Sequence, residues 1–262
     1  MISPQAIIEP GAKLGQNVQV YPFAYIQADV EIGDNTIVYP QASILNGSRI
    51  GANNRIFQNA VIGSMPQSFH FKEGTPVHVT IGDNNIIREN CVIAGGYESP
   101  EGTVIGNDNC LMDRAHLCHD VRIKNRCVVG INTILSSRVE IDSNTILSNS
   151  VVCGVGVRIG RYTLVQSGCR MQKDVPPYII LGDNPARYRG VNTTVLTQTG
   201  TDERTLRHIG NAYRLVYMGN FSLEDAILQI KDQIPPGEQI DYITSFIENS
   251  PGGIVRTMKD EG

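Results

Sequence analysis

The stretch IQADVEIGDNTIVYPQASILNGSRI, from Ile26 to Ile50, carries a large aliphatic residue at every sixth position. The same register extends along the chain in both directions and resumes after two interruptions. Its anchors are Ile2, Ile8, Leu14, Val20, Ile26, Ile32, Val38, Ile44, Ile50, Ile56, Ile62, Ile81, Ile87, Ile93, Ile105, Leu111, Leu117, Ile123, Val129, Leu135, Ile141, Leu147, Cys153, Ile159, Val165 and Met171. A period of six does not fit an α-helix and matches short parallel strands stacked in an all-β solenoid, a parallel β-helix. Chance alternation in an ordinary β protein would not keep one register over so many repeats.

A second position of the repeat supports this prediction. Four residues after most anchors the side chain is small or β-branched, as at Ala24, Val30 and Thr36. One large and one small inward side chain per repeat is what a tightly wound coil requires. Gly, Asp or Asn often follows the anchor, as in IGDN at 32–35 and again at 81–84, and these residues suit sharp corners with unusual backbone angles.

Two segments leave the repeat. We predict a solenoid over residues 1–190 with loop insertions at 64–80 and 94–104. The coil is expected to end near DVPPYIILGDNPARYRG, residues 174–190, because the consecutive prolines in it lack the N–H donors that another strand needs. Since a solenoid encloses no cleft, ligands are expected at the projecting loops or between subunits.

Residues 191–262 predict a small C-terminal helical domain. Apolar residues recur there at helical spacing, and Ser222 with Asp225 forms a variant of the capping box. Gly219 is placed to end the first of the long helices. The expected helices span 202–218, 223–234 and 238–249.

The composition excludes several classes of partner. The formal charge is −4 and no block of like charges occurs, so nucleic acid and anionic membranes are not expected partners. No apolar run approaches the ~20 residues needed to cross a bilayer, and the start lacks the features of a signal peptide. We expect a cytoplasmic protein without membrane insertion. Its six cysteines show no C-x-x-C spacing, which favours reduced thiols over disulfides or zinc ligands.

The segment AHLCHD, residues 115–120, holds two of the five histidines of the chain. Because Leu117 is an inward anchor, His116 and His119 are expected at outward or corner positions. A zinc site requires three or four ligands, and no other histidine or cysteine pair has a suitable spacing, so no metal is predicted. The remaining interpretations are a catalytic base with helper groups, or polar residues with a structural role. His70 and His208 are expected to be solvated.

Several motifs occur in an order that resembles one family of hexapeptide-repeat enzymes. They are PQ at 66–67, LM-x-x-AH-x-x-HD at 111–120, QKDVPPY at 172–178, GVN at 190–192, NAYRLVY at 211–217 and GGIVR at 252–256. The chain resembles, over its whole length, the acyl-carrier-protein-dependent UDP-N-acetylglucosamine O-acyltransferases of lipid A biosynthesis. The resemblance implies a left-handed β-helix and a homotrimer with active sites between subunits. It also implies an acyl carrier protein as donor, a sugar nucleotide as acceptor, and no cofactor except the phosphopantetheine arm of the donor.

The resemblance assigns catalytic roles to two residues. His119 takes the place of the general base that removes a proton from a sugar hydroxyl as the oxygen attacks the acyl thioester. This role suits an imidazole, which accepts a proton near neutral pH. The developing oxyanion needs a preorganised donor, which in the family is a backbone N–H one coil beyond the base. Three hexapeptides beyond His119, this position falls at Ser137.

The resemblance also implies residues that contact the substrates. His116 lines the pocket, although a structural hydrogen-bonding role fits it equally well, and Asp120 either orients groups or binds the sugar. Gln67 and Asn192 match acceptor-site residues of the family. Ser167 aligns near the residue that limits the acyl groove, and its small side chain is compatible with a long chain.

The chain departs from the family pattern on the acceptor side. The departures are Ser68 for an aspartate, Ala94 to Tyr97 for His-Arg-Gly-Thr, Arg138 for a histidine, Gly154 and Val155 for His-Gln, and Gln198 and Thr199 for two basic residues that hold the nucleotide phosphates. Losing two cationic side chains weakens a pyrophosphate site, because charge-assisted bonds are among the strongest polar contacts. Arg138 could supply one charge from a new direction.

Two functional hypotheses follow. The first is an acyltransferase of this family with altered acceptor recognition. The second is a non-catalytic trimeric binding or scaffold protein with the same fold. Since the carrier protein is acidic in the family, a basic docking patch is also expected, with Arg187, Arg189, Arg204, Arg207 and Arg214 as candidates.

Overall fold

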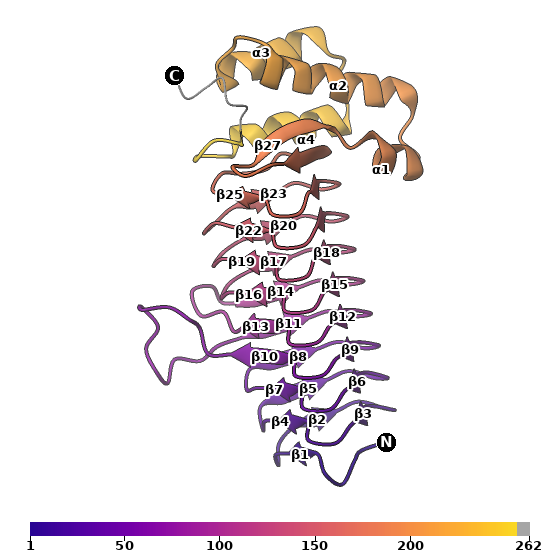
Figure 1. Cartoon of the computed structure of the whole chain (residues 1–262), viewed down its shortest axis with the longest axis vertical. Coiled ribbons are helices and arrows are strands. Elements are labelled where there is room, and N and C mark those ends of the chain that lie inside the picture. The colour runs from indigo at the N-terminus through magenta and orange to yellow at the C-terminus, as the bar shows by residue number, and fades with distance from the viewer. Residues whose placement is uncertain (256–262) are drawn as a thin grey trace.

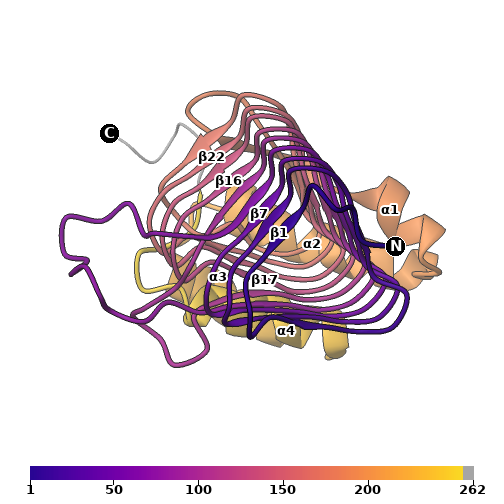
Figure 2. The same ribbon diagram turned by 90° about the horizontal axis from the view of Figure 1, so that it is seen from below.

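The computed structural model describes residues 1–255, which form a tall column of stacked coils with helices at its C-terminal end (Figure 1). Seen along the column, the coils are triangular (Figure 2). Within the described residues the strands form three sheets that run the length of the column. From β1 to β25 each paired strand is parallel to the third strand before or after it in the chain, as β16 is to β19. The predicted parallel β-helix is confirmed.

We name the sheets by their first strands. The β1 sheet contains β1 (Ile7–Ile8), β4 (Tyr25–Ile26), β7 (Ser43–Ile44), β10 (Val61–Ser64), β13 (Val92–Ala94), β16 (His116–Leu117), β19 (Ile134–Leu135), β22 (Val152–Cys153) and β25 (Arg170–Met171). The β2 sheet contains β2 (Lys13–Leu14), β5 (Val30–Ile32), β8 (Ser48–Ile50), β11 (Val79–Ile81), β14 (Thr103–Ile105), β17 (Arg122–Ile123), β20 (Glu140–Ile141) and β23 (Arg158–Ile159). The β3 sheet contains β3 (Gln19–Val20), β6 (Ile37–Val38), β9 (Arg55–Ile56), β12 (Ile86–Ile87), β15 (Cys110–Leu111), β18 (Val128–Val129), β21 (Ile146–Leu147), β24 (Leu164–Val165), β26 (Ile179–Gly182) and β27 (Arg187–Val191).

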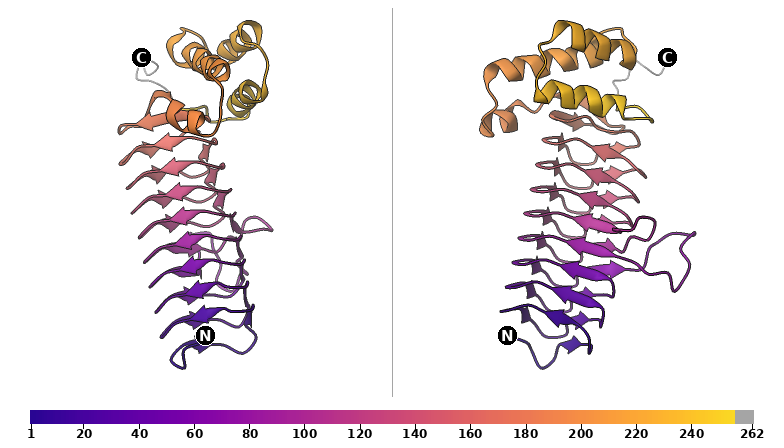
Figure 3. Two further views of the ribbon diagram at one scale, coloured as in Figure 1. Left: turned by 90° about the vertical axis from the view of Figure 1, so that its right-hand side faces the viewer. Right: turned by 180° about the vertical axis from the view of Figure 1, so that it is seen from behind.

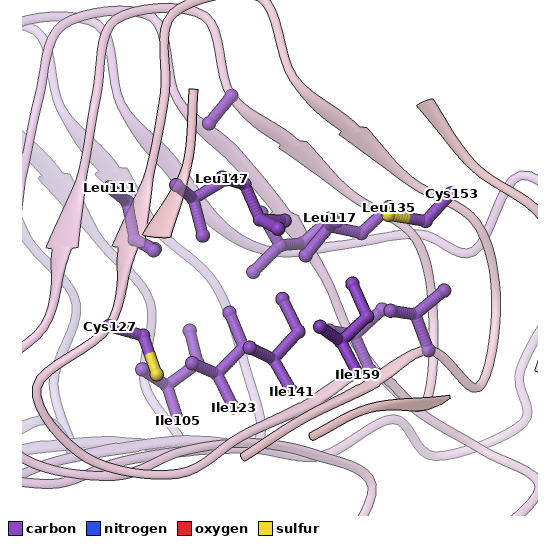
Figure 4. Close-up of a cluster of buried hydrophobic side chains, with 14 of the residues drawn as sticks. Ile105, Leu111, Leu117, Ile123, Cys127, Leu135, Ile141, Leu147, Cys153 and Ile159 are labelled. Atoms are coloured by element: carbon purple, nitrogen blue, oxygen red, sulfur yellow. The ribbon is translucent and has the colours of Figure 1, made fainter. Parts of the chain in front are cut away.

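The anchors of the repeat form the core. Anchors from successive coils stack in rows inside the column (Figure 4), with Ile105, Ile123, Ile141 and Ile159 in one row and Leu117, Leu135 and Cys153 in another. These side chains are at most 2% exposed, and burial of each large aliphatic one contributes roughly 1.5–3 kcal/mol. The first anchors are exceptions: Ile2 is 54% exposed and Ile8 and Leu14 are half-buried, because no coil lies beneath them.

The small inward position is polar in some successive coils, which the repeat did not predict. Asn54, Asn85 and Asn109 are buried one above another. The Asn85 side chain donates to Oδ1 of Asn54 (3.1 Å), and its own Oδ1 accepts the N–H of Asn109 (2.9 Å). Because each amide in this column has hydrogen-bond partners, its burial is tolerated.

The C-terminal end of the column differs in part from the expectation. Another strand, β26, follows Pro176 and Pro177 and pairs in parallel with β24, and β27 then returns antiparallel to it. The expectation that the prolines prevent a further strand was wrong. They precede Tyr178, whose N–H bonds to the Arg161 carbonyl, so they lie before β26 and remove no donor from its ladder.

The helices that follow are α1 (Thr193–Gln198), α2 (Glu203–Met218), α3 (Leu223–Gln233) and α4 (Glu238–Glu248). The last three coincide with the predicted ranges, and the Ser222 hydroxyl accepts the Asp225 N–H as the capping box requires. Helix α1 was not predicted, because it is short and only Leu196 of it is buried. Residues 256–262 of the predicted C-terminal segment lie outside the described residues. No helix within residues 1–255 is long and apolar enough to cross a membrane.

The helices are fastened to the last coils by polar contacts. Tyr242 of α4 donates its hydroxyl to Asp142, and Arg161 forms an ion pair with Glu238 (2.8 Å). The two insertions leave the column between β10 and β11 and between β13 and β14, at the same edge of the triangle (Figures 2 and 3). Hence segments 65–78 and 95–102 lie side by side, next to the coil that carries β16.

Candidate active site

The segment AHLCHD occupies β16 and the corner that follows it. Leu117 points into the core and is fully buried, whereas His116 faces outward from the β1 sheet between Val92 and Ile134 of the adjacent strands. Burial lowers the pKa of the His116 imidazole, which keeps it neutral at pH 7. Asp120 has φ +60°, a left-handed conformation that an aspartate tolerates better than most residues. The period of the repeat therefore fixes which way His119 and Asp120 leave the coil.

His119 and Asp120 form a buried pair. Nδ1 of His119 lies 3.0 Å from Oδ2 of Asp120. A carboxylate only accepts, so this contact selects the tautomer with the proton on Nδ1 and leaves Nε2 as a proton acceptor. The His119 side chain is only 5% exposed, because the Tyr97 ring packs against it with centroids 4.9 Å apart. The sequence predicted the corner position but not this cover.

The Asp120 carboxylate also organises the 95–102 insertion. It accepts the backbone N–H groups of Tyr97 (3.1 Å), Glu98 (3.2 Å) and Ser99 (3.0 Å), and the Ser99 hydroxyl (3.0 Å). Burial by itself would raise the pKa of the Asp120 carboxyl, but the hydrogen bonds from His119 and these N–H groups outweigh burial and lower that pKa. Both oxygens are engaged, so the carboxylate is placed to orient His119 rather than to bind a sugar.

The site also contains three side chains of the types that bind metal ions. Among residues 1–255, Glu98, His119 and Asp120 bring potential ligand atoms within 4.8 Å of one another. Glu98 is, however, paired with Arg138, and Asp120 already accepts several N–H groups. A metal ion would have to break these contacts, so the arrangement fits an oriented imidazole better than a metal centre.

The N–H of Ser137 is a candidate oxyanion donor. At an equivalent position of the repeat, the Ile131 N–H donates to the Asn149 side chain one coil further on (3.0 Å). One coil beyond Ser137 the corresponding residue is Val155, whose side chain has no acceptor. The Ser137 N–H has no hydrogen-bond partner in the part of the chain that the structure describes. It is therefore available to a ligand.

Comparisons with known proteins decide the family. The chain matches LpxA, a UDP-N-acetylglucosamine acyltransferase from Bacteroides fragilis, with 44% identity and a TM-score of 0.95, over 98% of this chain and 100% of that one. The chain belongs to the UDP-N-acetylglucosamine O-acyltransferase family. The enzyme from Francisella novicida has 32% identity and a TM-score of 0.95, over 99% of this chain and 95% of that one. LpxA from Acinetobacter baumannii has 30% identity and a TM-score of 0.94, over 97% and 99%.

Family models agree with these structures. Residues 174–255 match the model described as UDP-N-acetylglucosamine O-acyltransferase, domain 2, and residues 11–46 match the bacterial transferase hexapeptide model of six repeats. The β-helix is therefore the left-handed hexapeptide type, and the chain is an acyltransferase. The resemblance inferred from the sequence motifs is confirmed.

The other predicted site residues of this acyltransferase lie at different places. Arg138 is exposed at the corner after Ser137, and its backbone N–H donates to the His119 carbonyl (3.2 Å). Gln67 is exposed in the 65–78 insertion, whose Ser68 bonds to the Tyr97 hydroxyl (3.1 Å). His116, His119, Asp120, Ser137 and Arg138 thus come together within one chain.

Ser167 and Asn192 lie nearer the helical end. Ser167 is exposed at the corner after β24, whereas His119 follows β16, so the two residues lie at different corners. They are also more than two coils apart, which at ~4.8 Å per coil is a rise on the order of 10–15 Å along the column axis. Asn192 is buried at the start of α1 and donates its side chain to the Tyr162 carbonyl (3.0 Å). A cavity of about 320 Å³ near α1 is lined by Thr199 and Arg161 among others. Within one chain, these residues do not meet His119.

Sequence reasoning missed Tyr97, Glu98 and Ser99 as parts of the site. They lie in the predicted insertion 94–104, but no role was assigned to them. The signal that could have found them is the position of the insertion, which leaves the column one coil before His119. Without coordinates, nothing in the residue types showed that it folds back over the histidine.

We predict that Asp120→Asn loosens the insertion. The lowered pKa of Asp120 means that its stabilising hydrogen bonds are fully present above the unfolded value, about 3.9, and are lost as pH falls through the folded value. In the variant, hydrogen exchange at the Tyr97, Glu98 and Ser99 amides should accelerate about tenfold or more at neutral pH. Asp202→Asn, which removes a carboxylate charge at the N-cap of α2, is the control and should leave these amides unchanged. Equal protection in wild type and Asp120→Asn would contradict the assigned contacts.

Proposed function

We propose that this acyltransferase moves a 3-hydroxyacyl or similar acyl group from acyl carrier protein to a hydroxyl of a UDP-N-acetylglucosamine-like sugar nucleotide, in a pathway of the lipid A type. The observation that carries the proposal is the His119–Asp120 pair, with Nδ1 held at 3.0 Å and Nε2 left to accept a proton. The relatives named as UDP-N-acetylglucosamine acyltransferases support the acceptor class.

The proposed chemistry uses His119 as a general base. Nε2 removes the proton of the acceptor hydroxyl while the oxygen attacks the thioester carbonyl carbon. The carbonyl oxygen becomes an oxyanion, and we assign its stabilisation to the Ser137 N–H, which has no partner among the described residues. When the tetrahedral intermediate collapses, the C–S bond breaks and the departing thiolate of the phosphopantetheine arm takes the proton from His119. Asp120 stabilises the transient imidazolium. The donor carries its own prosthetic arm, so no further cofactor or metal enters the scheme.

We propose that acceptor recognition is altered relative to the family pattern. Gln198 and Thr199, which replace two basic residues, are exposed at the end of α1. Arg138 could take part in anion binding, but its guanidinium pairs with Glu98, which would have to yield to a phosphate. His116, Gln67 and Asn192 are the other proposed acceptor contacts, and Ser167 lines the proposed acyl groove. This site suits a sugar nucleotide whose binding depends less on cationic contacts to its phosphate groups.

A homotrimer is proposed from the outward faces of the column. The β2 sheet is mainly charged outward, whereas the β3 sheet is mainly apolar, for example at Ile86, Val128 and Ile146. The β1 sheet is also partly apolar, and Ile134 on it is 41% exposed. Two different apolar faces on one subunit favour a closed ring of heterologous contacts, and the triangular cross-section suits three copies. His119 would then lie next to an interface.

The arginines of α2 are the proposed docking patch for the acidic carrier protein. Arg204, Arg207 and Arg214 are exposed, and the nearest acidic partner among them is Glu203, 3.8 Å from Arg207. Arg189, by contrast, is paired with Asp183. Arg204 and Arg214 have no ion pair among the described residues, and the contact of Arg207 is long and exposed, so these groups can meet an acidic surface.

We predict that His119→Ala lowers kcat about 10²- to 10⁴-fold, because proton removal from the acceptor loses its base. The assay uses acyl carrier protein thioesters with a panel of sugar nucleotides. His70→Ala, which removes an exposed histidine, should retain wild-type activity. Full activity of His119→Ala would refute the mechanism, and turnover with none of the sugar nucleotides would refute the acceptor class.

Charge reversal on α2 should raise KM for the carrier-protein donor and leave KM for a small donor nearly unchanged. We expect Arg204→Glu, Arg207→Glu and Arg214→Glu in one variant to raise KM for the acyl carrier protein thioester about tenfold or more. KM for an acyl pantetheine thioester should stay within about twofold, since that donor has no protein surface. An unchanged KM for the carrier protein would exclude this patch.

The trimer can be tested on its apolar face. Ile146→Glu introduces a charge on the β3 sheet, which should dissociate the assembly because a buried unpaired charge is costly. Thr80→Glu places the same charge on the β2 sheet and should leave the trimer intact. Light scattering after gel filtration measures both. A wild-type monomer at micromolar concentration would rule out the trimer.

A further inference from the structure

The 95–102 insertion is built as a fixed cover over His119. Its main chain forms an antiparallel bridge with the other insertion, in which the His78 N–H bonds to the Gly96 carbonyl (2.9 Å) and the Gly96 N–H to the His78 carbonyl (3.0 Å). A Cβ on Gly96 would lie 2.5 Å from the Gly102 carbonyl carbon, so only glycine fits. The two insertions are therefore joined through their backbones.

Ion pairs fix the same segment on its other side. Glu98 pairs with Arg138, which follows β19, and Glu101 pairs with Arg122 of β17 (2.6 Å). Between these points the turn at 97–99 directs its N–H groups at the Asp120 carboxylate. The turn is thus held by the coil below, the coil above and the neighbouring insertion.

Tyr97 extends from this turn onto the catalytic imidazole. Its ring is tilted by 44° to that of His119, with centroids 4.9 Å apart. Its hydroxyl bonds to Ser68 (3.1 Å), and the Phe71 ring meets it edge-on, with centroids 5.2 Å apart. Tyr97 is therefore held by Ser68 and Phe71 of the other insertion while its ring packs on His119.

We propose that Tyr97 is a positioning residue for the His119 base. The Asp120 contact holds Nδ1 but leaves the imidazole free to swing about that bond. The Tyr97 ring blocks this rotation, and together the two contacts aim Nε2 in one direction. Misplacement of a reacting group by ~1 Å costs about 10²-fold in rate, so the contact bears directly on kcat. This inference rests on the proposed role of His119.

Variants at position 97 separate the ring from the hydroxyl. Tyr97→Ala should lower kcat about 10- to 100-fold and leave KM for the donor within about twofold. Tyr97→Phe is the matched control: it loses the Ser68 bond but keeps the ring, and should stay within about threefold of wild type. Tyr97→Leu fills part of the space without the ring, so it should keep the fold and lower kcat by more than Tyr97→Phe but by less than Tyr97→Ala; it also tests the role of the ring if Tyr97→Ala fails to fold.

A double-mutant cycle distinguishes positioning from general damage. If Tyr97 acts through the base, Tyr97→Ala should have no further effect on the residual activity of His119→Ala. Additive losses would overturn the inference. NMR gives a readout without turnover, because the Tyr97 ring current should displace the His119 ring-proton signals in wild type and Tyr97→Phe but not in Tyr97→Leu. Identical His119 shifts in wild type and Tyr97→Leu would also overturn it.

The kinetic outcomes distinguish a failure of the proposed His119 mechanism from a failure of the Tyr97 role. Full turnover by His119→Ala would refute the proposed mechanism whatever position 97 does. Loss of turnover in His119→Ala together with wild-type kcat in folded Tyr97→Ala and Tyr97→Leu would refute only the role of Tyr97.

Discussion

Stacking of each inward side chain on its equivalent in the next coil is the interaction on which the whole molecule depends. Leu117 lies between Ile93 and Leu135, and the same spacing recurs along the column. This stacking buries the anchors almost completely and leaves the corners and outward faces free to vary. The site lies at such a corner, so the repeat sets the backbone conformation of its residues.

The Asp120 carboxylate connects this backbone conformation to the proposed role of His119. Asp120 takes the left-handed corner conformation that recurs through the solenoid, yet its oxygens hold both the His119 imidazole and the turn at 97–99. A single side chain therefore couples the orientation of the proposed base to the position of the turn that covers it. Because its hydrogen bonds outweigh the cost of burial, the group remains ionised over the neutral range.

The departures from the family pattern are connected in space. Val155 offers no acceptor to the coil below, which leaves the Ser137 N–H free, and Arg138 beside it pairs with Glu98, which directly follows the replaced segment 94–97. Tyr97 belongs to the same segment and packs on His119. These changes thus lie around His119, whereas Gln198 and Thr199 lie apart from it at the end of α1.

The sequence by itself determined the β-helix, the inward residues, the long helices and the family, because a strict six-residue period constrains every coil locally and the motifs keep their order. It also located His119 and Ser137 one coil apart, since the period converts sequence distance into stacking. Only the tertiary structure decided that Tyr97, Glu98 and Ser99 fold back onto Asp120, that His119 is buried beneath them, and that β26 follows the prolines. Insertions have no period, and their course depends on contacts with other coils and with each other, which residue spacing does not encode.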